Sequence, residues 1–179
     1  MTSGLRYGKN KDMENKIDLK KLSEEIPVKW RVQSTRNGYA LCVAYVDARD
    51  VQNHLDEVVG MENWQSRHKE EKGNLFCEIG IKINNEWIWK SDVGTESSIE
   101  KQKGEASDSF KRSAVMWGVG RFVYDYPIIK VKTKKHKNNK EYPCSNKAKG
   151  LILFDGNSLT AYINHCLNKF ELKEIKKGI

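Results

Sequence analysis

A lysine next to an arginine, inside a stretch of helical periodicity, is the residue pair best suited to chemistry in this 179-residue chain. Lys111 and Arg112 lie between Phe110 and Ala114, which fall on the apolar stripe of the expected helix. Adjacent helical side chains point about 100° apart, so the two cations could neutralise neighbouring phosphates. The same residues also suit an ordinary solvated helix face in which Asp108 pairs with Arg112 one turn along. Both interpretations require a long helix that displays the pair.

A second charged motif, Glu70-x-Lys72, permits metal-dependent hydrolysis instead. Metal nucleases place an aspartate upstream of an E-x-K triplet, because two carboxylates hold the divalent ion and the lysine steadies the attacking water. Asp47 or Asp56 would supply the upstream carboxylate. A lone short motif is weak evidence, however, and the chain has no P-loop, no G-x-S-x-G and no H-E-x-x-H motif. We expect binding and not catalysis, with a metal-dependent nuclease or a basic protein-interaction module as alternatives.

The cysteines and histidines show no metal-ligand spacing. No C-x-x-C motif occurs, and the cysteines are widely spaced, so we expect no zinc site, no other metal and no cofactor. The N-terminal residues lack the apolar core of a signal peptide, and no apolar run reaches the roughly 20 residues of a membrane span. We therefore expect a cytoplasmic protein with no membrane partner. Two of the four cysteines, Cys42 and Cys77, lie in apolar runs and are expected in the core.

The net charge of +8 comes almost entirely from one tract. Residues 130–149 hold eight lysines and one glutamate, a net charge of +7, which leaves +1 for all other residues. The tract is expected to form a basic loop or hairpin and not a core element. As a functional element it would capture a polyanion by counterion release; as a solvated insertion it would only keep the chain soluble. Its candidate binding residues are Lys132, Lys134, Lys135 and Lys137.

Periodicity predicts an α+β fold in which an antiparallel β-meander packs against a long helix. The meander strands are joined by short turns at Gly73-Asn74 and Asn84-Asn85, and an earlier hairpin turns at Asn37-Gly38. The expected strands are 28–32, 39–46, 64–69, 75–83, 87–93 and 151–154. The expected helices are 48–59, a long helix from Ser97 or Ser98 to Tyr124, and a last helix after the Asp155-to-Ser158 turn.

The order of motifs across the middle of the chain is similar to that of a known family. Y-V-D-A-R-D-V opens a helix that closes in V-G-M-E-N-W, and a later strand ends in D-V-G. The helix start E-K-x-K-G-E-A-S-D-S-F-K-R then leads to W-G-x-G-R. This pattern resembles the Rad52/Rad22 family of single-strand annealing proteins, in particular the short phage and prophage members. The resemblance covers roughly Trp30 to Tyr126.

The resemblance implies a β-β-β-α core that assembles into rings of about ten subunits. Such rings hold single-stranded DNA in a basic groove and anneal complementary strands in recombination and repair, without ATP, metal or a chemical step. It also implies the cytoplasm of a bacterial host, with a phage exonuclease or a single-strand binding protein as possible partners. The expected organisation is a flexible, partly helical arm (1–26), the Rad52-like DNA-binding core (27–127), the lysine-rich loop or hairpin (128–150), and a strand and helix packed on the core (151–179).

The resemblance also assigns roles to residues. The family's principal groove contact is a Lys-Arg pair in the long helix, which falls on Lys111 and Arg112. A basic residue at the start of the first helix is a second contact, and its best match is Arg49, displaced by one position. Two further basic positions precede the pair and are matched by Lys101 and Lys103.

Overall fold

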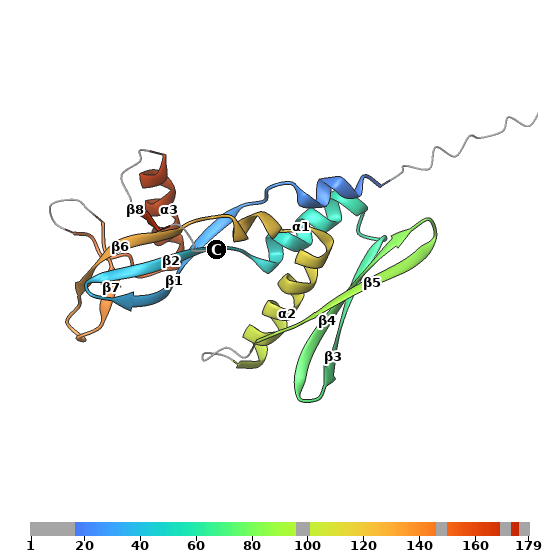
Figure 1. Ribbon diagram of the computed structural model, residues 1–179, viewed down its shortest axis with the longest axis horizontal. Helices are drawn as coiled ribbons and strands as arrows, with labels where there is room; N and C mark the ends of the chain where they lie inside the picture. The colour runs from blue at the N-terminus through green and yellow to red at the C-terminus, as the bar shows by residue number, and fades with distance from the viewer. Residues whose placement is uncertain (1–16, 96–100, 146–149, 169–172, 176–179) are drawn as a thin grey trace, which may run out of the picture.

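Two antiparallel sheets lie on either side of the helices α1 and α2 (Figure 1). The computed structural model describes residues 17–95, 101–145, 150–168 and 173–175, and of residues 101–103 and 173–175 it describes the backbone alone. Within these ranges, no helix combines the length and the apolar character that a membrane span requires.

The predicted meander and its long helix are confirmed. The strands pair in the order β3-β4-β5, and α2 packs across β4 and β5. The turn at Asn84-Asn85 has positive φ at both residues (51° and 65°), as a tight hairpin requires. The other turn is centred on Lys72-Gly73, one residue earlier than predicted, because Asn74 already pairs with Glu71. The bounds are β3 (Trp64–Glu71), β4 (Asn74–Ile83), β5 (Glu86–Val93) and α2 (Lys101–Trp117).

The helix α2 ends earlier than its sequence pattern suggests. It was expected to reach Tyr124, but Gly118 and Gly120 adopt φ of 104° and 71°, which breaks the helix after Trp117. A short 3-10 helix, η2 (Arg121–Tyr124), follows. A Cβ on Gly120 would lie 2.9 Å from Cγ2 of Val46, so this break also lets the chain pass close to β2. The predicted start at Ser97 or Ser98 lies outside the described residues.

The second sheet joins segments that are far apart in the sequence. Its order is β1-β2-β6-β7, with β8 also pairing with β6. The predicted Asn37-Gly38 turn connects β1 to β2. The expectation that residues 130–149 stay out of the core is wrong for the start of this tract, because Val131 in β6 is fully buried. The expected hairpin is formed by β6 and β7, which pair antiparallel. The bounds are β1 (Val28–Arg36), β2 (Tyr39–Val46), β6 (Ile128–Lys135), β7 (Glu141–Pro143) and β8 (Lys173–Ile175).

Side-chain caps fix the helices where the sequence predicted them. Asp47 accepts a hydrogen bond from the Arg49 amide at the start of α1, and Asp155 accepts from the amides of Asn157 and Ser158 at the start of α3. The expected strand over residues 151–154 is reduced to one β-bridge between Ile152 and Cys144. The bounds are η1 (Leu19–Ser23), α1 (Ala48–Val59) and α3 (Gly156–Leu167).

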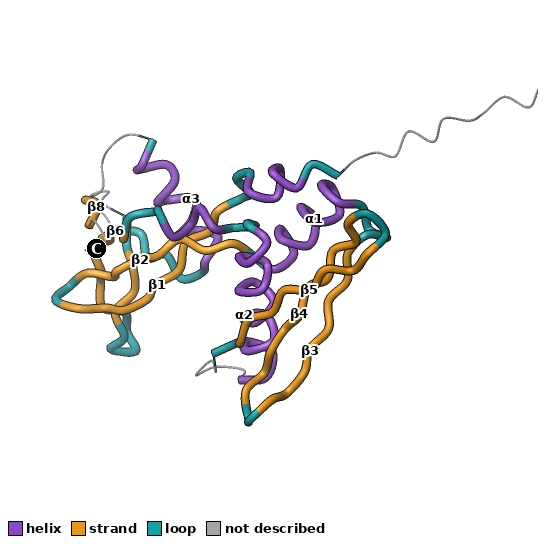
Figure 2. Tube along the Cα trace, turned by 45° about the vertical axis from the view of Figure 1, so that its right-hand side comes forward, coloured by secondary structure: helices purple, strands orange, loops and turns teal. Residues whose placement is uncertain are grey.

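The apolar residues form two separate clusters, one for each sheet. In the first, α1 and α2 cover the meander. Phe110, Ala114 and Trp117 of α2 are buried in this cluster, as their helical spacing predicted. In the second, α3 covers one face of the other sheet (Figure 2), and Trp30 is fully buried with its Nε1–H donating to Asn164 Oδ1 at 3.0 Å. The buried residues of this second cluster are Trp30, Ala40, Cys42, Ile129, Val131, Leu153, Leu159 and Ile163.

Candidate nucleic-acid interface

A basic cavity of about 470 Å³ lies where the first strands of one sheet meet the helix α2. Strand alternation turns Arg31 and Tyr45 toward this cavity, since Arg31 pairs with Val43 in the register and Tyr45 is two residues further along β2. The helix contributes Lys111 and Arg112. Three cations therefore face one carboxylate, Asp108, in a recess that also holds a tyrosine ring.

Lys111 is half-buried and has no ion-pair partner among the described residues. Burial lowers its pKa from the ordinary value; Arg31 acts in the same direction, whereas Asp108 opposes both. Its Nζ lies 5.6 Å from the centroid of the Tyr45 ring. A cation held in a partly dry recess without a counter-ion is poorly solvated, so an entering anion would be favoured at this position.

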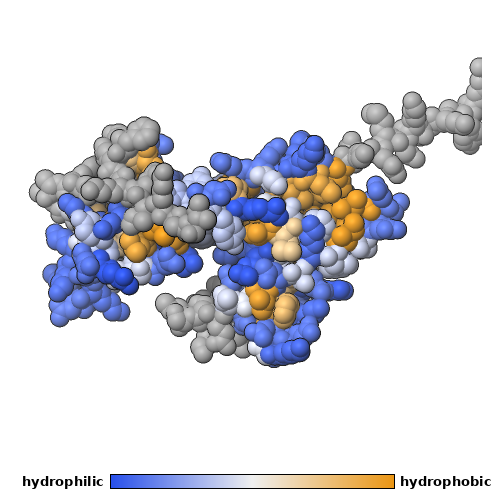
Figure 3. All heavy atoms as spheres, in the orientation of Figure 1, coloured by the Kyte–Doolittle hydropathy of each residue, from blue (hydrophilic) through white to orange (hydrophobic). Residues whose placement is uncertain are grey.

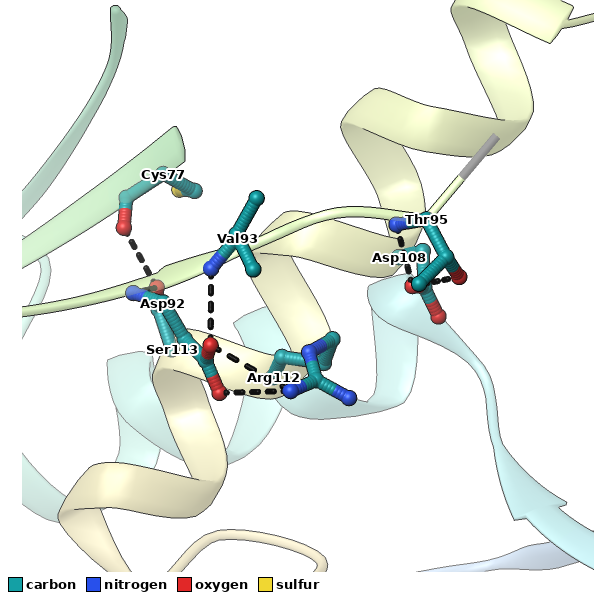
Figure 4. Close-up of polar contacts among 7 residues, drawn as sticks. All are labelled: Cys77, Asp92, Val93, Thr95, Asp108, Arg112 and Ser113. Carbon is teal, nitrogen blue, oxygen red and sulfur yellow. Dashed lines mark hydrogen bonds and ion pairs between the residues drawn. The ribbon is translucent and has the colours of Figure 1, made fainter. Parts of the chain in front are cut away.

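Arg112 is held by a carboxylate of the meander and not by its own helix (Figure 4). Its Nη2 lies 3.3 Å from both carboxylate oxygens of Asp92, and Asp92 Oδ1 also accepts a hydrogen bond from the Val93 amide. The intrahelical pair with Asp108 is not formed, because Asp108 Oδ2 accepts from the amide and hydroxyl of Thr95. The Nε atom of Arg112 is buried and has no hydrogen-bond partner in the described part of the chain. The guanidinium is thus positioned by Asp92 and retains unused donor capacity.

Of the other residues assigned by the resemblance, the structure describes the side chain of Arg49 alone. Arg49 is exposed in the first turn of α1 and does not line it. At the same end of α1, the Nζ atom of Lys29 lies 3.1 Å from Asp47 Oδ2 and 3.5 Å from Asp50 Oδ2. The backbone hydrogen bond from Arg49, reinforced by Lys29, lowers the pKa of Asp47. Lys101 and Lys103 belong to the first turn of α2, and their side chains lie outside what the structure describes.

The four candidate lysines of the basic tract are all exposed, but they do not share one face. Lys132 and Lys134 alternate along β6 and lie opposite Tyr39 and Tyr142 in the neighbouring strands. Lys135 points to the other face of the strand, across from Glu141. Lys137 lies in the β6–β7 turn. Figure 3 shows hydrophilic residues covering this end of the sheet.

The alternative nuclease motif is divided among separate elements. Glu70 is exposed near the end of β3, and Lys72 is in the turn that follows. Of the possible upstream carboxylates, Asp47 caps α1, and Asp56 accepts a 2.6 Å hydrogen bond from Trp64 Nε1. No cluster of three or more metal-binding side chains is formed within the described ranges.

A larger cavity, about 740 Å³, lies between η1 and the second half of α1, but it has the wrong charge for a polyanion. Carboxylates dominate its rim and would repel phosphate. They are Asp18, Glu24, Glu25, Glu57 and Glu62, with Lys21 as the cationic member of the lining.

Sequence reasoning found Lys111 and Arg112 but missed Arg31. The available indication was the alternation in VKWRV, which buries Trp30 and so turns Arg31 to the opposite face. Nothing in the sequence pattern alone shows that this face meets α2, because the two segments are about 80 residues apart.

Two curated proteins are similar to this chain over about half of its length. The single-stranded DNA-binding protein DdrA of Deinococcus radiodurans is 34% identical over 103 residues, which is 56% of this chain and 48% of that protein. The protein of the same name from Deinococcus deserti is 33% identical over 90 residues, 49% of this chain and 44% of that protein. The chain thus spans about half the length of these curated relatives, and no solved structure matches it. The family model for Rad52/22 double-strand break repair proteins matches residues 11–142, and by this match and the motif order the chain belongs to the Rad52/22 family.

Proposed function

We propose that this chain binds single-stranded DNA in the cavity between β1, β2 and α2 and promotes annealing of complementary strands. The observation that carries the proposal is the convergence of Arg31, Lys111 and Arg112 on a recess with one carboxylate. Single-strand binding without sequence preference needs cations along a backbone and aromatic faces for bases, and Tyr45 supplies an aromatic face here. The curated relatives named as single-stranded DNA-binding proteins support the same ligand.

Annealing follows from electrostatics and preorganisation. Neutralised phosphates no longer repel the incoming strand, and a strand held extended loses less entropy when its bases find their partners. Family membership supports assembly into a closed ring of about ten subunits, in which the cavities of successive subunits would hold one strand continuously. We further propose that the protein is encoded by a phage or prophage and acts in the host cytoplasm, beside an exonuclease or a single-strand binding protein.

The test removes the two helical cations together. Lys111→Ala with Arg112→Ala should abolish most binding to a labelled oligonucleotide and most annealing of complementary oligonucleotides. The slope of log affinity against log salt should fall by about 1.4, because each lost phosphate contact on a single strand contributes about 0.7. Light-scattering mass, with and without DNA, reports whether the oligomer survives.

The matched control is Lys20→Ala with Lys21→Ala, which removes an adjacent exposed pair of the same charge from η1. It should leave binding and annealing close to those of the unmodified protein. Normal annealing by the Lys111/Arg112 variant would overturn the assignment of the cavity. Magnesium-dependent shortening of the labelled DNA would favour the nuclease alternative.

A further inference from the structure

The sheet next to the cavity contains no carboxylate in its three longest strands. β1, β2 and β6 together hold no aspartate or glutamate, whereas they carry several cations. α3 packs on one face of this sheet and buries Ala40, Cys42, Ile129 and Val131. The residues that alternate with these point to the opposite face. The cations of the three strands are Lys29, Arg31, Arg36, Lys130, Lys132, Lys134 and Lys135.

This opposite face, here called the open face, has an aromatic and apolar centre between two rows of cations. β2 is the central strand, and Tyr39 and Leu41 on it are half-buried. In the register, Tyr39 lies between Arg36 of β1 and Lys132 of β6, both exposed. The Nζ of Lys130 lies 4.4 Å from the centroid of the Tyr39 ring. Each feature that a single strand requires, a stacking surface and flanking cations, is therefore present.

The open face is continuous with the cavity described above. Val43 and Tyr45 of β2 line the cavity and belong to the same alternating set as Tyr39. Tyr39 and Tyr45 are six residues apart, which is about 20 Å along a strand. A strand leaving the cavity along β2 would therefore meet a second tyrosine without leaving the surface.

We propose that the open face is a track for single-stranded DNA that extends the cavity site toward the end of the sheet. A base stacks on Tyr39, and the adjoining phosphates contact Lys132 of β6 and Arg36 of β1. This proposal rests on the proposed function, because the track continues the same strand. It adds a binding segment on the sheet of β1, β2 and β6, separate from the Lys111-Arg112 pair, and assigns the basic tract a place on strand β6.

Charge argues against the open face of a second copy as the occupant. The chain carries +8, and the open face is among its most positive regions, so two such faces would repel each other. A protein partner would need a strongly acidic surface to compensate the exposed cations of this face, such as Arg36 and Lys132. A nucleic acid strand supplies that charge at every residue and also supplies flat bases for the tyrosine.

The strand geometry of β6 provides a matched pair of variants. Lys132→Ala removes a cation from the open face, whereas Lys135→Ala removes the same charge, three residues along, from the face that carries Glu141. With a 30-nucleotide oligo-dT, Lys132→Ala should lower the salt slope by about 0.7 and weaken binding several-fold. Lys135→Ala should change neither, which would remove Lys135 from the candidate binding residues of the basic tract. Equal effects of the two variants would overturn the track in favour of diffuse attraction.

Stacking on Tyr39 is tested with a strand that lacks bases. Tyr39→Ala should weaken binding to oligo-dT roughly fivefold or more, because base–aromatic stacking contributes that much per base, whereas Tyr39→Phe keeps the ring and the affinity. On an abasic oligonucleotide of the same length, Tyr39→Ala should bind as well as the unmodified protein. A loss on the abasic strand equal to that on oligo-dT would refute the stacking role.

The two proposals fail in different ways. If the unmodified protein does not bind oligo-dT, the proposed function itself is wrong. If it binds, and Lys111→Ala with Arg112→Ala abolishes binding while Lys132→Ala and Tyr39→Ala have no effect, the cavity site stands and the track is refuted.

Discussion

Replacing Asp92 should strengthen DNA binding, whereas replacing its partner Arg112 should weaken it. The two side chains form one ion pair, with Nη2 at 3.3 Å from each carboxylate oxygen. If Arg112 is only structural, the two substitutions act alike, since each breaks the same pair. If Arg112 also binds phosphate, they act in opposite directions, because Asp92 competes with the phosphate for the same guanidinium.

The exposure of the two side chains sets the expected losses of stability and of single-strand affinity. The side chains of Arg112 and Asp92 are 39% and 28% exposed, so solvent screens the pair and its loss should cost about 0.5 kcal/mol of stability. For a chain of this size that lowers the melting temperature by about 1–2 °C. A charge-assisted contact to phosphate is worth about 1.5–3 kcal/mol, so Arg112→Ala should weaken single-strand binding by roughly tenfold or more.

Asp92→Asn removes the charge and keeps Oδ1, which accepts from the Val93 amide, so the end of β5 should keep its geometry. Two unit charges about 6 Å apart repel by about 0.7 kcal/mol in water and about 2.8 kcal/mol at an effective dielectric constant of 20. Removing the carboxylate should therefore tighten binding roughly threefold or more at low salt.

Fluorescence anisotropy with oligo-dT at two salt concentrations, beside thermal melts, measures both quantities. Arg121→Ala is the matched control, because Arg121 donates to the Val115 carbonyl and does not line the cavity. If Asp92→Asn and Arg112→Ala weaken binding equally, Arg112 acts only by holding α2 against β5, and its role as a phosphate ligand is refuted.

Two further predictions concern the backbone break and the buried cation. Gly120→Ala should destabilise the fold by about 1–3 kcal/mol in denaturant titrations, which is more than Gly38→Ala should. Both glycines have positive φ, but only a Cβ on Gly120 would lie 2.9 Å from Val46. Equal losses of stability would show that the close contact with β2 is unimportant. Lys111→Met should raise the free energy of unfolding while lowering single-strand affinity. This gain should shrink as pH rises toward the ordinary lysine pKa of 10.5, because the lowered pKa lets folded Lys111 lose its charge first; a pH-independent gain would exclude desolvation as the cause.

Much of the local structure could be predicted because caps, turns and strands depend on residues that are close together in the sequence. The cap at Asp47, the turn at Asn84-Asn85 and the meander strands all follow from neighbouring residues. The pairing of β2 with β6 was not predicted, since it joins segments about 90 residues apart and no pattern specifies a partner at that distance. The density of lysines in β6 also hid the alternation of Ile129 and Val131, which is the ordinary pattern of a half-buried strand.

The site shows the same division between local and long-range information. Lys111 and Arg112 were identified from the motif that contains them, and the helix was correctly expected to display them. Their surroundings were not predictable, because Arg31, Tyr45 and Asp92 reach them from three different strands. Asp108, the partner expected from helical spacing, instead binds Thr95.

The distribution of charge gives the strongest physical argument that the open face and cavity exist for a ligand. Folding alone favours carboxylates near a half-buried lysine, because an unpaired cation in a recess lowers stability. Yet Lys111 is left without an ion-pair partner among the described residues, and the three strands beside it contain no carboxylate at all. Several other cations are paired, as Arg67 and Lys69 are with Glu78 and Lys29 is with Asp47 and Asp50. A half-buried, unpaired cation such as Lys111 is expected where a polyanion supplies the missing negative charge on binding, and stability is partly given up for affinity.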